Sequence, residues 1–125
     1  MKRLIVCADG TWNQRDQASK NAKTRRPTNV MKVARAVLSR DSKGIDQVVV
    51  YHEGVGTAGG LDKFTGGAFG DGIEQNVRSL YRSILYNYCP GDELFLFGFS
   101  RGAFAVRTLL GFINLVGLLE KDDDY

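Results

Sequence analysis

One serine of this chain stands in a context that is typical of a catalytic nucleophile. Ser100 lies at the centre of the run Gly98-Phe99-Ser100-Arg101-Gly102, a G-x-S-x-G pattern that directly follows an apolar segment. In this pattern the serine occupies a sharp turn between a strand and a helix. The turn exposes the hydroxyl, and the glycines stand where close packing leaves no room for side chains. The sequence therefore predicts a nucleophile elbow. The alternative is a serine that caps a buried helix beside two packing glycines.

An acyl-transfer site also needs N–H groups that stabilise the oxyanion of the tetrahedral intermediate. The expected donors are the backbone N–H of Arg101, which follows the serine, and an N–H of the loop after a neighbouring strand, where Gly10 and Thr11 stand. The alternative for that loop is a glycine turn followed by a packed tryptophan. Asp9 and His52 also follow expected strands, so we expect them to line the same site. We assign no metal ligands and expect no cofactor.

The elements that must position these residues follow from the pattern of apolar positions. Strands are expected at 2–8, 46–51 and 94–99, and helices at 30–38, 73–88 and 101–119. Residues 54–72 hold eight glycines and are expected to form a loop. Strands that alternate with helices form a parallel sheet with right-handed crossovers. The expected fold class is therefore a three-layer α/β fold in the order β-α-β-α-β-α, with ligands at the carboxyl ends of the strands.

Length and composition limit the classes of protein that fit. The chain has 125 residues, about one domain, and its net charge of +3 does not indicate nucleic-acid binding. Residues 14–27 form a basic loop and residues 120–125 an acidic tail. Cys7 and Cys89 are expected at opposite edges of the sheet, about 15 Å or more apart, which is too far for a disulfide. We therefore expect free thiols, no transmembrane segment and a cytoplasmic location.

Several ordered motifs resemble those of a known family. ADGTWN, PTNV, GVGT, FGDGI, PGDELFLFGFSRGAFAVR and a closing GL follow one another between Asp9 and Leu118. Together they are similar to the α/β-hydrolases typified by type VI secretion phospholipase effectors (Tle-type), long catalogued as a domain of unknown function. The resemblance implies an α/β-hydrolase-like sheet, Ser100 as the nucleophile of a Ser-Asp-His triad, and esters such as phospholipids as substrates. It also implies a secreted effector as an alternative to a cytoplasmic protein.

Two other motifs compete with this interpretation. Residues 54–59 satisfy the G-x-G-x-x-G pattern of dinucleotide-binding folds and follow a strand, but they do not open a helix. Residues 7–11 resemble the D-x-D-G-T motif of haloacid-dehalogenase-type phosphatases, with Cys7 in the position of the nucleophilic aspartate. Both alternatives are weaker than the serine hydrolase interpretation.

The sequence lacks the partners that a catalytic serine needs. A serine hydroxyl requires a base and an acid that orients the base, and in α/β-hydrolases both follow the serine along the chain. After Ser100 there is no histidine, and the only acids are Glu120, Asp122, Asp123 and Asp124. His52 precedes the serine, so it could act only in a rearranged triad; the alternative is a partly exposed loop histidine.

The same conclusion follows from the sheet. By resemblance, the three strands correspond to the third, fourth and fifth of the family's sheet, in spatial order two, one, three, which leaves strand 93–98 at an exposed edge. We therefore interpret residues 1–125 as an incomplete half domain, the nucleophile-bearing N-terminal portion of a serine ester hydrolase, inactive alone. The alternative is a non-catalytic assembly module. Either form would pair through strand 93–98, with a C-terminal half or with a second copy.

Overall fold

The computed structural model describes residues 1–10, 27–54 and 67–119, with only the backbone described for 67–71. The elements alternate along the chain as the sequence predicts. They are β1 (Arg3–Ala8), α1 (Asn29–Ala36), β2 (Gln47–His52), α2 (Gly67–Asn87), β3 (Glu93–Gly98) and α3 (Arg101–Val116). The α/β fold class is therefore confirmed.

The three strands form one parallel sheet in the order β2-β1-β3, as predicted. Ala8, His52 and Gly98 stand side by side in the strand register, so the carboxyl ends of all three strands meet at one edge. The central strand β1 is apolar because it is buried on both faces. This arrangement brings the loops that follow the strands to a common edge of the sheet.

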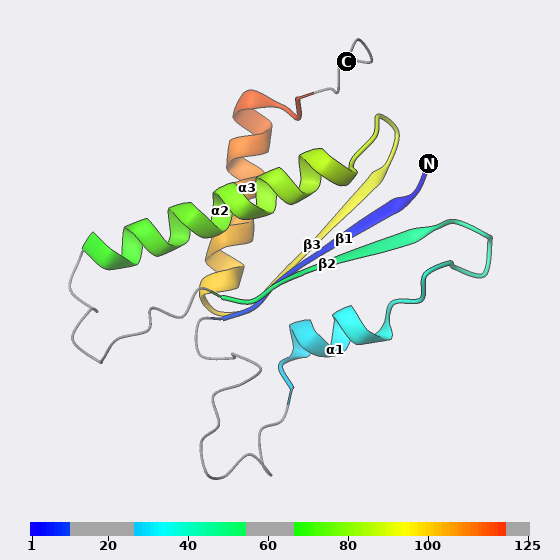
Figure 1. The fold of residues 1–125 in the computed structure, drawn as a ribbon, viewed down its shortest axis with the longest axis horizontal. Coiled ribbons are helices and arrows are strands. Elements are labelled where there is room, and N and C mark those ends of the chain that lie inside the picture. Colours follow the sequence, from blue (N-terminus) through cyan, green and yellow to red (C-terminus); the bar gives the residue numbers. More distant parts are fainter. Residues whose placement is uncertain (11–26, 55–66, 120–125) are drawn as a thin grey trace.

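Helices cover both faces of the sheet, α1 on one side and α2 with α3 on the other (Figure 1). Alternate residues of β1 serve the two layers. Leu4, Val6 and Ala8 belong to a core with buried residues of α2 and α3, whereas Ile5 and Cys7 pack with Val30 of α1. The two hydrophobic clusters fix the position of each helix relative to the sheet.

The largest differences from the sequence expectation lie at the start of α2 and the end of α3. The loop predicted for 54–72 is too long, because α2 already begins at Gly67. Extending a formed helix gains one hydrogen bond per residue, which offsets the cost of about 1 kcal/mol for each glycine. The prediction for α3 is also too long, because the helix stops at Val116 instead of residue 119. Gly117 follows with φ of 78°, and its N–H donates to the Ile113 carbonyl at 2.8 Å, which ends the helix.

The first helix begins one residue before the predicted start and ends two residues early. Thr28 is the N-cap of α1, and its hydroxyl accepts a hydrogen bond from the Met31 N–H at 3.1 Å. The helix stops at Ala36 because Val37 has an extended backbone with ψ of 124°. Because the helix ends early, Val37 lies outside it and lines a groove beside the helix.

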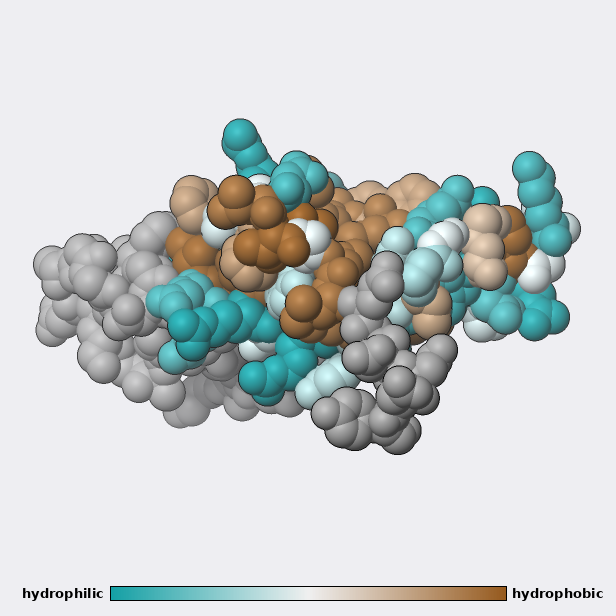
Figure 2. Space-filling model, turned by 90° about the horizontal axis from the view of Figure 1, so that it is seen from above, coloured by the Kyte–Doolittle hydropathy of each residue, from teal (hydrophilic) through white to brown (hydrophobic). Residues whose placement is uncertain are grey.

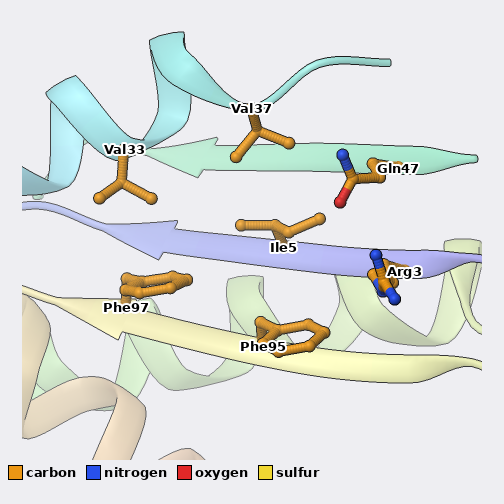
Figure 3. Close-up of a pocket in the computed structure, with 7 residues that line it drawn as sticks. All are labelled: Arg3, Ile5, Val33, Val37, Gln47, Phe95 and Phe97. Atoms are coloured by element: carbon orange, nitrogen blue, oxygen red, sulfur yellow. The ribbon is translucent and has the colours of Figure 1, made fainter. Parts of the chain in front are cut away.

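Apolar side chains remain exposed along β3 and α3. Within the described part of the chain, β3 pairs only with β1, and the rings of Phe95 and Phe97 are 42% and 38% exposed. They line a groove of about 260 Å³ beside α1 (Figure 3). Figure 2 views the molecule from above and shows hydrophobic residues gathered on that face, where Figure 1 places the end of α3. Leu115, in the last turn of α3, is 84% exposed. In the described ranges, no helix is long and apolar enough to cross a membrane.

Candidate functional site

The turn between β3 and α3 has a strained backbone at its serine. Ser100 has φ of 55° and ψ of −120°, and among the described residues other than glycine it alone has a positive φ. Such a conformation costs on the order of 1–3 kcal/mol and persists only where the surrounding structure enforces it. Ser100 occupies the N-cap position of α3, but its side chain makes no capping hydrogen bond. The hydroxyl therefore does not serve the role that the helix-capping alternative assigns to it.

The two glycines of the motif stand at backbone contacts that exclude a side chain. A Cβ atom at Gly98 would lie 2.5 Å from the Gly102 carbonyl oxygen. A Cβ atom at Gly102 would lie only 2.1 Å from the Ala8 carbonyl oxygen. Close contact of α3 with the ends of β1 and β3 thus requires glycine at both positions. The Phe99 N–H donates to the same Ala8 oxygen at 3.0 Å and ties the turn to the central strand.

Gly10, which follows β1, lies directly against this turn. A Cβ atom at Gly10 would be 3.3 Å from the Ser100 Cβ and 3.5 Å from the Phe99 carbonyl oxygen. The structure thus brings together Gly10 and Ser100, which are ninety residues apart in the sequence. The Gly10 N–H donates to Oδ1 of Asp9 at 2.8 Å, so this donor is engaged by its own neighbour. Arg101 is the first residue of α3, where backbone N–H groups favour negative charge.

Asp9 is the centre of a buried polar network at this edge. Its side chain is 2% exposed, and its Oδ2 accepts hydrogen bonds from the Thr28 hydroxyl at 2.7 Å and the Tyr51 hydroxyl at 2.6 Å. The Asp9 N–H donates to the His52 carbonyl at 3.0 Å. Sequence reasoning missed the contributions of Thr28 and Tyr51. A hydroxyl-bearing tyrosine at the end of an otherwise aliphatic strand was the available signal for a buried polar partner.

His52 is the last residue of β2, not a loop residue. Its backbone stands beside Ala8, and Ala8 stands beside Gly98, so β1 separates His52 from the strand that leads to Ser100. Two strand spacings amount to about 10 Å. Within the described ranges, no hydrogen bond joins the side chains of His52 and Ser100. Burial lowers the pKa of His52, which favours a neutral imidazole at pH 7.

The phosphatase-like alternative requires a nucleophile at position 7, and the structure places that side chain elsewhere. Cys7 is fully buried and packs beneath α1 with Ile5 and Val30. Burial, with a smaller contribution from the charge of Asp9, raises the pKa of its thiol to about 11. Cys7 and the exposed Cys89 are both free thiols, as predicted.

Other predicted features fall on residues that the structure does not describe. They are Thr11, nearly all of the basic loop 14–27, the glycine motif beyond Gly54, and the acidic tail 120–125. The described residues contain no group of three His, Cys, Asp or Glu side chains that could hold a metal ion.

Comparison with known proteins places this geometry in a family context. A family model described as the catalytic domain of Tle1-like phospholipase effectors of type VI secretion systems matches residues 2–125. An uncharacterized protein of Saccharomyces cerevisiae, YEL023C, is 31% identical over 134 residues, which cover 96% of this chain and 18% of the yeast protein. The chain thus spans about a fifth of the length of this curated relative. No solved structure matches the chain.

Proposed function

Because the chain belongs to the family of Tle1-like phospholipase effector catalytic domains, we propose that it is the nucleophile-bearing N-terminal portion of a serine ester hydrolase. The single observation that carries the proposal is the strained Ser100 backbone at the N-terminus of α3. Strain of this kind at a strand-to-helix turn, with an uncapped hydroxyl, is typical of a catalytic nucleophile. The proposed substrates are carboxylic esters, with phospholipids as the class that the family suggests.

The chemistry proposed for the site is acyl transfer. Ser100 Oγ attacks the ester carbonyl, its proton passes to a base, and the carbonyl oxygen becomes an oxyanion. The Arg101 N–H is the proposed donor on the elbow side, and the loop after Gly10 supplies the second donor. Because the Gly10 N–H is bonded to Asp9, we assign the second donor to Thr11 in preference to Gly10. Collapse of the intermediate then expels the alcohol and leaves an acyl ester on Ser100.

We further propose that residues 1–125 alone do not turn over esters. No histidine follows Ser100 in the sequence, and His52 lies across β1 from the strand that carries it. In this proposal the α/β-hydrolase-like sheet is incomplete, and the base and acid come from a polypeptide that completes it. Cytoplasmic location and secretion as an effector both remain compatible with this proposal.

A thiol at position 100 tests the nucleophile without requiring the missing base, because a fraction of a thiol is already ionised at neutral pH. In a Cys89→Ser background, Ser100→Cys is expected to release one equivalent of p-nitrophenolate per chain from p-nitrophenyl acetate. The helix N-terminus lowers the thiol pKa and the N–H groups stabilise the oxyanion. Cys7 does not compete, because it is fully buried.

The exposed Cys89 of the unmodified chain provides the matched control. After correction for the thiolate fraction, the thiol introduced by Ser100→Cys is expected to acylate at least about tenfold faster than Cys89. An equal or slower rate would show that the turn offers no site for acyl transfer. The unmodified chain is expected to show no turnover that Ser100→Ala abolishes, and such turnover would contradict its proposed inactivity.

A non-catalytic assembly module is the second candidate, and the exposed apolar surface of β3 and α3 favours it. Contiguous apolar patches larger than a few hundred Å² are rare on monomers and mark association sites. If this surface pairs two copies, light scattering coupled to size exclusion will report a dimer, and Phe95→Lys will dissociate it. Leu38→Lys is the control, because Leu38 is 70% exposed outside the β3 and α3 surface. A folded monomer at about 100 μM, a concentration on the order of the dissociation constant of a weak interface, would exclude the pairing of two copies.

A further inference from the structure

The Asp9 carboxyl joins the segments that surround the elbow. It receives one hydrogen bond from the turn after β1, one from the cap of α1 and one from β2, all between 2.6 and 2.8 Å. Among the described residues, Asp9 and Asn76 are the buried polar side chains, and of the two only Asp9 is fully buried. Burying a carboxyl group is costly unless hydrogen bonds satisfy it, so a buried carboxyl group beside the carboxyl ends of the strands calls for a role.

The position of Gly10 indicates what that role is. Oδ1 of Asp9 accepts the Gly10 N–H and so fixes the orientation of the peptide plane between the two residues. The backbone of Gly10 is the wall against which Ser100 packs. The carbonyl oxygen of Asp9 lies 2.8 Å from where a Cβ of Gly102 would stand, so Asp9 also contacts the first turn of α3. A shift in Asp9 would therefore move the backbone against which Ser100 packs.

We propose that Asp9 is a positioning residue for the reaction at Ser100. Through Oδ1 it sets the turn that faces the elbow, and through Oδ2 it anchors this turn to Thr28 and Tyr51. In this proposal Asp9 does not touch the ester and transfers no proton; it acts by holding the Gly10 backbone against which Ser100 packs. This inference rests on the proposed function, since it needs acyl transfer at position 100.

The test compares acylation rates in the Ser100→Cys, Cys89→Ser chain, which serves as the parent. Asp9→Asn keeps the shape of the side chain but removes the negative charge and replaces one acceptor oxygen with an NH2 group. The charge-assisted hydrogen bonds are therefore lost, and the Thr28 and Tyr51 hydroxyls must rotate to accept from the amide if they are to bond it at all. A small displacement of the backbone that packs against the nucleophile disturbs its alignment for attack, and we expect about a tenfold lower limiting acylation rate. The ester concentration at half-maximal rate is expected to stay the same, because the loss occurs in the transition state.

Tyr51→Phe and Tyr81→Phe form a matched pair. Each removes one tyrosine hydroxyl, but Tyr51 bonds Asp9, whereas Tyr81 bonds the Gly117 carbonyl at the far end of α3. We expect Tyr51→Phe to lower the limiting acylation rate about threefold and Tyr81→Phe to leave it unchanged, at similar melting temperatures. If Asp9→Asn fails to fold, Tyr51→Phe decides the question, because it retains the carboxyl group.

The outcomes separate the two proposals. Equal limiting rates for Asp9→Asn, Tyr51→Phe and Tyr81→Phe, with a fast burst in the parent, overturn the positioning role and leave the proposed function intact. The absence of a fast burst in the parent overturns the proposed function, and the positioning role with it. A rate loss shared by Tyr81→Phe would trace the effect to general stability and also contradict the positioning role.

Discussion

Substituting Gly102 by alanine tests whether the close contact between α3 and β1 requires a glycine at this position. The new Cβ would stand 2.1 Å from the Ala8 carbonyl oxygen, 2.6 Å from the Ala8 carbonyl carbon and 2.8 Å from the Asp9 carbonyl oxygen. All three atoms belong to the backbone, and the Ala8 oxygen is held by the Phe99 N–H. No side-chain rotation can relieve the overlap. The helix must therefore move away from β1 by about 1 Å to restore an ordinary contact.

The cost of that movement follows from what α3 buries. Ala105 and Leu109 are fully buried against β1 in the main core, and Val106 is nearly so. A gap of 0.5–1 Å forfeits roughly a quarter to a half of the dispersion energy of such contacts. Overpacking of this kind typically costs about 1–3 kcal/mol, and a clash with rigid backbone lies at the upper end. We expect Gly102→Ala to lower the free energy of unfolding by about 3 kcal/mol, a large part of the stability of a small domain.

Urea unfolding followed by circular dichroism measures this effect, and Gly111→Ala is the matched control. Gly111 lies in the same helix, and a Cβ there would meet nothing within 4 Å. We expect Gly111→Ala to raise the free energy of unfolding by about 0.5–1 kcal/mol, because alanine is the better helix former. With an m-value of about 1.5 kcal/mol/M, Gly102→Ala lowers the urea midpoint by about 2 M. A urea midpoint within about 0.3 M of that of the unmodified chain would refute the reasoning. Such a shift corresponds to only about 0.5 kcal/mol, which is less than the cost of about 1–3 kcal/mol that is typical of overpacking.

Two further predictions concern pH. Burial opposes ionisation of Asp92, but hydrogen bonds from the Lys2 side chain and from the backbone N–H groups of Lys2 and Cys89 outweigh it and lower the Asp92 pKa to about 2. This stabilisation is complete above about pH 4 and is lost as the pH falls toward 2. Asp92→Asn is therefore expected to lower the free energy of unfolding by about 1–2 kcal/mol at pH 7 and by little at pH 2. Asp46→Asn is the control, because Asp46 is exposed and its substitution should change the free energy of unfolding little at either pH. Burial lowers the pKa of His52, so the unfolded chain binds the imidazole proton more tightly than the folded chain does. The free energy of unfolding is therefore expected to fall as the pH drops below about 6.5. His52→Gln is expected to abolish this dependence of the free energy of unfolding on pH. As the chain has one histidine, a single imidazole NMR signal reports the titration, and a midpoint at or above 6.5 would contradict the prediction.

Local patterns in the sequence predict the elements well and their ends less well. The aliphatic runs locate β1 and β2 to within a residue, whereas only the structure shows that Thr28 caps α1. The start of α2 at Gly67 is missed because glycine content indicates loop, whereas propagation from a packed helix can override a modest local penalty. Helix ends depend on such small differences in free energy, and neighbouring packing decides them.

The sequence alone determines the order of the elements, the parallel sheet and the glycines that flank Ser100, because period, turn chemistry and the absence of a side chain are local properties. The tertiary structure decides which distant groups meet. It places Gly10 against Ser100 and brings the Asp9 carboxyl within hydrogen-bonding distance of the Thr28 and Tyr51 hydroxyls. It also puts β1 between His52 and the strand that leads to the serine. These contacts join residues tens of positions apart, and only the strand order and the register bring them together.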